Sequence, residues 1–220
     1  MRSRPLSPRF IEALRFATTA HEGQGRKGTD TPYVAHLLAV TAIVLEHGGD
    51  EDQAIAALLH DAIEDQGGDG MRTRIREKFG ERVTGMVDDC TDAEVLPKPP
   101  WKERKLAYLA HIPAAHKDSL LVSMSDKLHN SSSILRDFNR HGVSVFDRFS
   151  AGPDDTVWYY ESLVAAFAAE EPGGDAAALL GELRSVVDEL RRSVARDGCC
   201  SEDDGRLSGD DGGRSEADDG

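Results

Sequence analysis

Residues 54–65 read Ala-Ile-Ala-Ala-Leu-Leu-His-Asp-Ala-Ile-Glu-Asp. Six apolar residues are followed by a cluster of one imidazole and three carboxylates, His60, Asp61, Glu64 and Asp65. On a regular helix, residues four positions apart share a face, so we expect His60 to lie beside Glu64 and Asp61 beside Asp65. Burying one such group without a partner costs about 2–7 kcal/mol, and a divalent metal ion would compensate the whole cluster. The stretch therefore predicts a buried helix that carries metal ligands.

Apolar residues recur at helical spacing along the rest of the chain as well. No segment shows the alternation of apolar and polar residues that is typical of a half-buried strand. The sequence predicts helices over residues 8–21, 32–46, 50–65, 71–79, 81–91, 101–111, 118–139, 155–170 and 175–192. The expected fold is all-α, with a single helical-bundle domain over residues 1–196.

Acidic residues are concentrated at the C-terminal end. The 220 residues carry a formal net charge of −14, and residues 197–220 contain nine acidic residues against two arginines. That segment has almost no apolar side chains to offset the entropy of folding, so we expect a disordered acidic tail over residues 197–220. The acidic balance also disfavours binding to DNA or RNA, which requires a basic surface.

Three further observations bear on where the protein works. The sequence has no apolar run of roughly 18 residues, so we expect no membrane-spanning helix. The first ten residues lack the apolar segment of a secretory signal. Cys90, Cys199 and Cys200 do not form a disulfide framework, which favours a reducing, cytoplasmic setting. The oligomeric state, the role of the tail and the role of the adjacent Cys199 and Cys200 stay open.

Two residues outside this stretch also qualify as metal ligands. His36 lies in the first turn of an apolar helix, and Asp126 ends an apolar segment in the second half of the chain. Together they complete a mixed set of imidazoles and carboxylates that suits manganese, with iron and zinc as alternatives: His36, His60, Asp61 and Asp126. Such an ion lowers the pKa of a bound water, which then acts as a nucleophile at neutral pH. Taken singly, His36 reads as an ordinary core histidine and Asp126 as a partner of Lys127 or Arg136, so the hypothesis depends on the set.

Carboxylates next to the proposed ligands suit proton transfer. Glu64 and Asp65 lie one helical turn beyond His60 and Asp61. From there they would orient or deprotonate the attacking water, or protonate a leaving group. Carboxylates at the end of a helix oppose its dipole, which favours a functional reason for their presence.

Cations and an amide near the same set suit a phosphorylated substrate. Arg26 and Lys27 are adjacent in a glycine-rich loop that precedes the helix of His36. A guanidinium clamps phosphate or stacks on a base, and a lysine adds a second positive charge. Asn130 follows Asp126 by four residues, so it shares a helix face with the proposed ligand and points toward the same site.

Three motifs give the chain a resemblance to a known family. They are Arg26-Lys27-Gly28-Thr29-Asp30-Thr31-Pro32-Tyr33-x-x-His36, His60-Asp61-x-x-Glu64-Asp65 and Ser125-Asp126-Lys127-x-x-Asn130. In this order and spacing, the chain resembles the HD-domain hydrolases of the RelA/SpoT-homologue group, and within it the small, single-domain alarmone hydrolases. The resemblance covers residues 7–170, and the chain is too short for the synthetase and regulatory domains of the long members.

The resemblance implies a function and a role for each motif residue. It implies a manganese-dependent hydrolase that removes the 3′-pyrophosphate of guanosine tetra- or pentaphosphate, (p)ppGpp, to give GDP or GTP. The implied roles are metal binding by His36, His60, Asp61 and Asp126, handling of the water by Glu64 and Asp65, stacking on the purine by Arg26, phosphate or base contacts by Lys27, and nucleotide contact by Asn130.

The chain departs from the family pattern at two places. Before the motif aspartate the family often has Lys-x-Ala, where this chain has Ser123-Met124-Ser125. After the motif asparagine the family often has Met/Leu-Arg-Thr/Asp, where this chain has Ser131-Ser132-Ser133. These changes spare the expected metal ligands and bear on the substrate. Two alternatives therefore stay open: hydrolysis of another nucleotide such as an adenosine alarmone, and a non-catalytic nucleotide-binding module.

Overall fold

The computed structural model describes residues 5–92 and 97–203, with side chains as far as Asp197. Within these ranges the chain is helical apart from its connecting loops, and its only strand-like pairing is one antiparallel bridge between Gly25 and Pro32. The predicted all-α fold is confirmed. Of the described helices, none combines the length and the hydrophobicity that a bilayer crossing requires.

Ten α-helices and two short 3-10 helices follow one another along the described chain. They are α1 (Pro8–Ala20), α2 (Val34–Glu46), α3 (Glu51–Leu59), α4 (Ala62–Gln66), α5 (Gly68–Phe79), α6 (Glu81–Cys90), α7 (Trp101–His111), η1 (Ile112–Ala114), α8 (Lys117–His141), η2 (Gly142–Arg148), α9 (Pro153–Ala169) and α10 (Gly174–Asp203).

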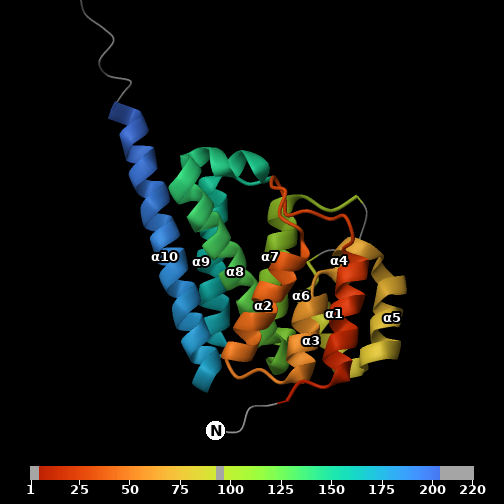
Figure 1. Cartoon of the computed structure of the whole chain (residues 1–220). Coiled ribbons are helices and arrows are strands. Elements are labelled where there is room, and N and C mark those ends of the chain that lie inside the picture. Colours follow the sequence, from red (N-terminus) through yellow and green to blue (C-terminus); the bar gives the residue numbers. More distant parts are fainter. Residues whose placement is uncertain (1–4, 93–96, 204–220) are drawn as a thin grey trace, which may run out of the picture.

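The long helix α8 lies at the centre of the bundle (Figure 1). It packs against α2, α3 and α6, and also against α9 and α10, so it joins the two groups of helices. Leu59 of α3, Val122 of α8 and Leu183 of α10 are fully buried in the shared core. Burying a leucine side chain contributes about 1.5–3 kcal/mol, so this apolar interior holds α8 firmly in place.

The expected helix over residues 50–65 is divided into α3 and α4. It begins as the sequence indicates, with a capping box in which Asp50 accepts from Gln53 N and Gln53 accepts from Asp50 N. α3 ends at Leu59, His60 keeps helical angles (φ −58°, ψ −28°), and Asp61 turns to φ −99°, ψ −2°. The expected single helix is therefore divided at the two proposed ligands, although the hydrogen bond from Asp65 N to Asp61 O, at 3.0 Å, still spans the turn.

The last helix extends beyond its expected end at residue 192. α10 continues to Asp203 and packs along α8 and α9, with Leu190 buried and Val194 packed against the core. Residues 197–203, which we expected to be disordered, are thus the end of a helix. The rest of the predicted acidic tail, residues 204–220, and the side chains of Cys199 and Cys200 lie outside the described residues. Cys90 is buried and free.

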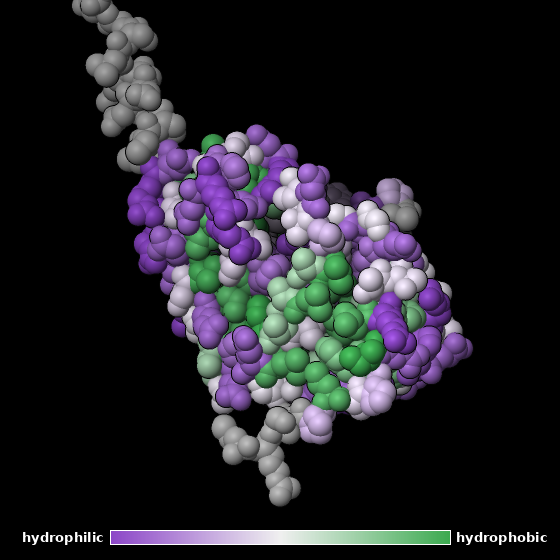
Figure 2. Space-filling model, viewed as in Figure 1, coloured by the Kyte–Doolittle hydropathy of each residue, from purple (hydrophilic) through white to green (hydrophobic). Residues whose placement is uncertain are grey.

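Apolar side chains also reach the surface. Figure 2 shows them gathered on the face formed by α1 and α2, where the exposed large hydrophobic residues are Ile11 and Leu38. The sequence explains this, because α2 is apolar on nearly every side and its alanines and leucines cannot all face the core. The inner side of α2 positions His36 in the interior.

Candidate functional site

Histidine and aspartate side chains from separate helices meet inside the bundle. His36 comes from α2, His60 from the turn after α3, and Asp126 from α8. One ligand atom of each lies within 4.8 Å of the others, and all three residues are buried. Asp61 joins them, since its Oδ2 lies 2.9 Å from His60 Nε2 and 3.6 Å from His36 Nε2. The structure brings together all four residues that the sequence proposes as metal ligands.

The spacing of these donor atoms suits a cation between them. Asp126 Oδ1 lies 3.2 Å from His36 Nε2 and 3.4 Å from His60 Nε2. Ligand atoms bound about 2.1 Å from one ion are separated by about 3.0–3.4 Å. Both Nε2 atoms are buried, yet neither makes a hydrogen bond. Carboxylate oxygens face these nitrogens at 2.9–3.6 Å without an aligned hydrogen bond, so the residues fit a divalent metal ion that would satisfy both kinds of group.

The backbone of α3 holds the ring of His60. His60 Nδ1 lies 2.8 Å from the carbonyl oxygen of Ala57, which only accepts hydrogen bonds, so Nδ1 carries a proton. Burial lowers the pKa of His60, but Asp61 and Asp126 outweigh it and hold that pKa well above its usual value. A proton and a metal ion therefore compete for the remaining nitrogen, Nε2.

Neighbouring groups keep the two carboxylates ionised. Burial raises the pKa of Asp61, but the two imidazoles outweigh it, and that pKa lies well below its usual value. Burial acts in the same way on Asp126, where Lys127 outweighs it first and the imidazoles add to the effect. Tyr33 donates its hydroxyl to Asp61 Oδ2 at 2.5 Å. Ionised carboxylates of this kind are ready to bind a cation without losing a proton.

Asp126 contacts different partners through its two oxygens. Oδ1 faces the imidazoles, whereas Oδ2 accepts from Lys127 Nζ at 2.7 Å. The pairing with Lys127, which the sequence offers as an alternative to metal binding, therefore coexists with the cluster. Both side chains are nearly buried, at 7% exposure for Asp126 and 13% for Lys127.

Glu64 and Asp65 follow Asp61 on α4, but their carboxylates have other partners. Glu64 accepts from Lys98 Nζ at 2.7 Å and from the backbone N–H of Asp92 at 3.1 Å. Asp65 accepts from Gln24 Nε2 at 2.9 Å. Their proposed part in handling water remains a prediction.

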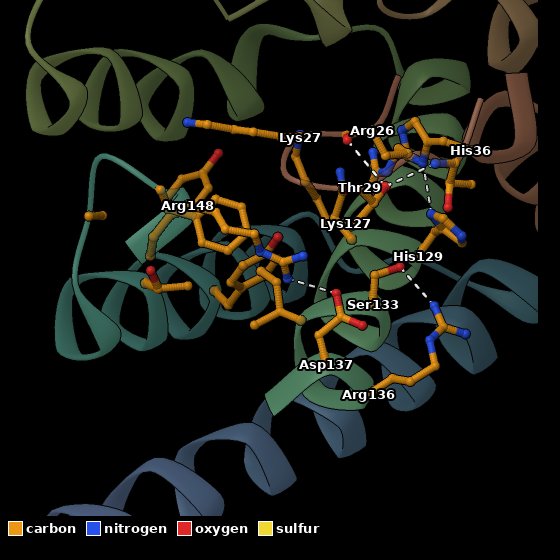
Figure 3. A pocket seen from close by; sticks show the side chains of 18 of the residues that line it. Arg26, Lys27, Thr29, His36, Lys127, His129, Ser133, Arg136, Asp137 and Arg148 are labelled. Atoms are coloured by element: carbon orange, nitrogen blue, oxygen red, sulfur yellow. Dashed lines mark hydrogen bonds and ion pairs between the residues drawn. The ribbon is translucent and has the colours of Figure 1, made fainter. Parts of the chain in front are cut away.

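A cavity of about 640 Å³ opens beside the cluster, between the loop before α2 and helices α7, α8 and α9 (Figure 3). A volume of this size accommodates a nucleotide. Cations dominate its described lining: Arg26, Lys27, Lys105, Lys127, Arg136, Arg140 and Arg148. The described lining holds one carboxylate, Asp137, which pairs with Arg148 at 2.7 Å. A cavity this basic in a chain of net charge −14 favours an anionic ligand.

The glycine-rich loop brings Arg26 to the cluster. The loop closes on itself through hydrogen bonds from Arg26 N to Thr31 O and from Tyr33 N to Gln24 O, both at 2.8 Å. Arg26 Nη2 then donates to Asn130 Oδ1 at 2.8 Å, and Asn130 Nδ2 donates to Asp126 Oδ1 at 2.6 Å. A continuous path of hydrogen bonds thus joins the loop to a proposed ligand.

Gly28 allows the loop to approach η2. Its φ of +72° favours glycine, and a Cβ there would lie 2.3 Å from Arg148 Cδ. Lys27 Nζ and the Arg148 guanidinium lie 5.9 and 5.5 Å from the ring centre of Phe149, which places both cations at the cavity wall. The predicted substrate residues Arg26, Lys27 and Asn130 therefore lie at one cavity.

Sequence reasoning missed several residues of this cavity. In the sequence, Lys105 follows Lys102 and Arg104, and Arg148 follows Arg140. Such clusters of basic residues are typical of a solvated surface, yet Lys105 and Arg148 line the wall. Tyr159 lines it too, with a buried hydroxyl that has no hydrogen-bond partner. His129 follows Asp126 by three residues, a spacing that would have placed it near the cluster. Lys105 and Tyr159 gave no comparable signal, because they reach the cavity only through the packing of α7 on α9.

The two departures from the family pattern affect the cavity little. Ser123 is buried and bonds Tyr108 at 2.5 Å, and Ser125 is buried and donates to Leu121 O. Ser131 is also buried, and Ser132 faces a separate groove between α8 and α10. Of the departing serines only Ser133 lines the cavity. Any change in substrate contacts from these replacements therefore centres on one hydroxyl.

Comparison with known proteins connects this geometry to a family. A family model described as HD domain matches residues 13–157. The chain is 39% identical over 134 residues to the guanosine-3′,5′-bis(diphosphate) 3′-pyrophosphohydrolase MESH1 of Xenopus tropicalis, a match that covers 60% of this chain and 70% of that protein. It is 35% identical over 127 residues to the MESH1 of Drosophila melanogaster, covering 56% of this chain and 68% of that protein.

A solved structure extends the comparison to most of the chain. It is described as a metazoan orthologue of SpoT that hydrolyses ppGpp, and it superposes with a TM-score of 0.67 at 27% identity. The superposition covers 86% of this chain and 98% of that one. The similarity therefore includes nearly the whole helical arrangement as well as the motif-bearing helices.

Proposed function

The chain belongs to the HD-domain family, and from this membership and the geometry of the site we propose that it is a (p)ppGpp 3′-pyrophosphohydrolase. The reaction adds water across the bond between the 3′ oxygen and its phosphorus. Guanosine tetraphosphate gives GDP and pyrophosphate, and the pentaphosphate gives GTP and pyrophosphate. The observation that carries the proposal is a cluster of imidazoles and carboxylates at the wall of a cation-lined cavity.

We propose that His36, His60, Asp61 and Asp126 hold one divalent metal ion, with manganese as the native ion and iron or zinc as alternatives. When bound, such an ion supplies Lewis acidity, which lowers the pKa of a water and stabilises charge on a phosphoryl oxygen. The buried Nε2 atoms of His36 and His60, which face carboxylate oxygens but make no hydrogen bond, support this assignment. The ionised state of Asp61 and Asp126 supports it as well.

The residues around the cluster are proposed to act on the water and to bind the nucleotide. Glu64 and Asp65 are our proposed groups for orienting the water and for transferring its proton. Arg26 would stack on the purine, Lys27 would contact phosphate or base, and Asn130 would contact the nucleotide. The hydrogen bonds from Arg26 to Asn130 and from Asn130 to Asp126 support a role in which the loop positions the nucleotide next to the cluster.

The proposal is tested with purified full-length chain and ppGpp. After treatment with a chelator and readdition of Mn²⁺, Fe²⁺ or Zn²⁺, products are separated by anion exchange. We expect GDP and pyrophosphate in equal amounts, with the fastest release in Mn²⁺. Absence of both products with every metal would overturn the proposal.

An adenosine alarmone is the second substrate to test, because Ser133 replaces the family's threonine or aspartate at the cavity wall. Adenosine 3′,5′-bis(diphosphate) and ppGpp are compared at equal concentration. We expect a higher kcat/KM for ppGpp. A higher value for the adenosine compound would keep the reaction and change the substrate. The cytoplasmic location, the lack of a nucleic-acid partner and the boundary at residue 196 remain predictions of the sequence.

A further inference from the structure

The two histidines of the cluster are supported in different ways. The ring of His60 is held by a backbone carbonyl, Ala57 O, which accepts from Nδ1 at 2.8 Å. The ring of His36 is held by a side chain instead: its Nδ1 lies 2.7 Å from Nδ1 of His129. The two rings lie 4.8 Å apart, centre to centre, at an angle of 37° (Figure 3).

A contact between two imidazole nitrogens at this distance needs one proton between them. The proton belongs either to His36 Nδ1, with His129 as the acceptor, or to His129 Nδ1, with His36 as the acceptor. The choice matters at the far side of the His36 ring. A neutral imidazole that accepts at Nδ1 carries its proton at Nε2, and Nε2 faces Asp126 Oδ1 at 3.2 Å. That tautomer cannot bind a metal ion through Nε2.

We infer that His129 is a positioning residue that holds His36 in the metal-binding tautomer. His129 accepts the Nδ1 proton of His36, which leaves Nε2 with a lone pair directed at the cluster. The inference rests on the proposed metal-binding role of His36. Backbone carbonyls and carboxylates commonly support metal-bound histidines in this way, and their loss costs about 10–100-fold in metal affinity.

The surroundings of His129 explain why a neutral acceptor is suited to this position. The residue lies on α8 one turn after Asp126, half-buried at the cavity wall beside Asn130. A carboxylate there would pair with Arg26, which already donates to Asn130 Oδ1 at 2.8 Å. An imidazole accepts from His36 without drawing Arg26 away from the asparagine. The support of His60 comes from the backbone carbonyl of Ala57, which no substitution of the Ala57 side chain removes. The support of His36 comes from the side chain of His129, so a substitution of His129 can remove it.

Matched substitutions separate hydrogen bonding from packing. His129→Phe keeps a flat ring but has no acceptor, whereas His129→Asn keeps an acceptor oxygen near the position of Nδ1. His141→Phe is the control, because His141 is exposed near the end of the same helix. Binding of Mn²⁺ to the metal-free full-length chain is measured by titration calorimetry without nucleotide.

We expect His129→Phe to bind Mn²⁺ about 10–100-fold more weakly than the wild type. His129→Asn should lie within about threefold of the wild type, and the control should be unchanged. Equal affinity for the wild type and His129→Phe would overturn the inference and leave the proposed function standing. Failure of the wild type to bind any divalent metal would instead overturn the proposed metal site.

A second measurement remains decisive if His129→Phe does not fold. In the zinc-loaded wild type, ¹⁵N-detected NMR of the histidine rings reports which nitrogens carry protons. We expect a proton on His36 Nδ1 and an unprotonated His129 Nδ1. A protonated His129 Nδ1 with an unprotonated His36 Nδ1 would contradict the inference.

Discussion

The guanidinium of Arg26 links the nucleotide-facing loop to Asn130 by a 2.8 Å hydrogen bond. Lysine keeps the charge but loses the planar fork that bonds the amide and stacks on a base. We expect Arg26→Lys to raise KM for ppGpp about tenfold, with kcat changed less than about threefold, because the interaction serves binding. Steady-state kinetics check this, with the exposed Arg192→Lys on α10 as control. A fall in kcat at unchanged KM would contradict the assigned role.

Asp126 and Lys127 form an ion pair, and substitutions at this pair can distinguish its effect on stability from its effect on metal binding. Asp126→Asn removes the only carboxylate that the described structure places on Lys127 Nζ. Breaking a buried pair costs about 3–5 kcal/mol, because a charge is left without its partner. We expect Asp126→Asn to lose both metal affinity and stability. The double variant with Lys127→Met should regain most of the stability without the metal affinity. Urea unfolding and calorimetry check this, and metal binding by the double variant would contradict it.

At the level of single residues, the motifs predict the proposed metal ligands better than the residues that support them. His36, His60 and Asp126 are polar residues buried in the bundle, and Asp61 lies beside His60 in the turn after α3. Lys105 and Tyr159 are different, because cations and tyrosines are common on half-exposed helices. Nothing in their local sequence distinguishes a cavity wall from a solvated face.

At the level of helices, periodicity predicts the α-helices, with α3 and α4 as one, but misses the 3-10 helices η1 and η2 and the turn between α3 and α4. Adjacent residues on a regular helix point about 100° apart, so a straight helix would not direct His60 and Asp61 at one point. The turn at Asp61 breaks this regular spacing, and Glu64, which follows the turn, pairs with Lys98. Helical spacing carries no signal for such a turn, because every residue involved is compatible with a helix.

The start of α8 depends on a carboxylate from another helix. Its N-cap residue, His116, provides no side-chain cap, and Asp89 of α6 accepts instead from His116 N at 2.9 Å and from Ser119 Oγ at 2.6 Å. An anion there is also favoured by the helix dipole. Burial raises the pKa of Asp89, but these bonds outweigh it, and the pKa lies below its usual value. We expect Asp89→Asn to cost about 2 kcal/mol at pH 7.

The pH dependence of this cost has a definite sign. A carboxyl whose pKa is lower in the folded state stabilises the fold above its unfolded pKa, about 3.9. That stabilisation is lost as the pH falls through the lower, folded pKa. The difference in unfolding free energy between wild type and Asp89→Asn should therefore shrink as the pH falls from about 4 to about 3. Urea titrations over this range check it, and a difference that stays constant or grows there would contradict it.

For the whole molecule, charge is separated between the surface and the cavity. A chain of net charge −14 keeps cations around one cavity and places many of its carboxylates elsewhere. The resulting field favours approach of an anionic nucleotide to the cavity. Composition gives the overall charge, but only the packing of α7, α8, α9 and the loop before α2 gathers the cations. The sequence therefore predicts the class of partner better than the shape of its site.

The boundary at residue 196 is tested by truncation. The last described side chains that pack on the body are Ser193 and Val194 of α10, so a chain ending at Arg196 keeps every described buried contact. We expect it to match the full chain in melting temperature within about 2 °C and in KM for ppGpp, because it keeps these described contacts. A chain ending at residue 173 loses the buried Leu179, Leu183 and Leu190. At about 1.5–3 kcal/mol for each leucine, this loss approaches the whole stability of a domain, so that chain should not fold.

Thermal unfolding and steady-state kinetics of both truncated chains check these expectations. A lower KM after removal of residues 197–220 would contradict the expected match in KM. It would show that the acidic segment competes with the substrate for the basic cavity.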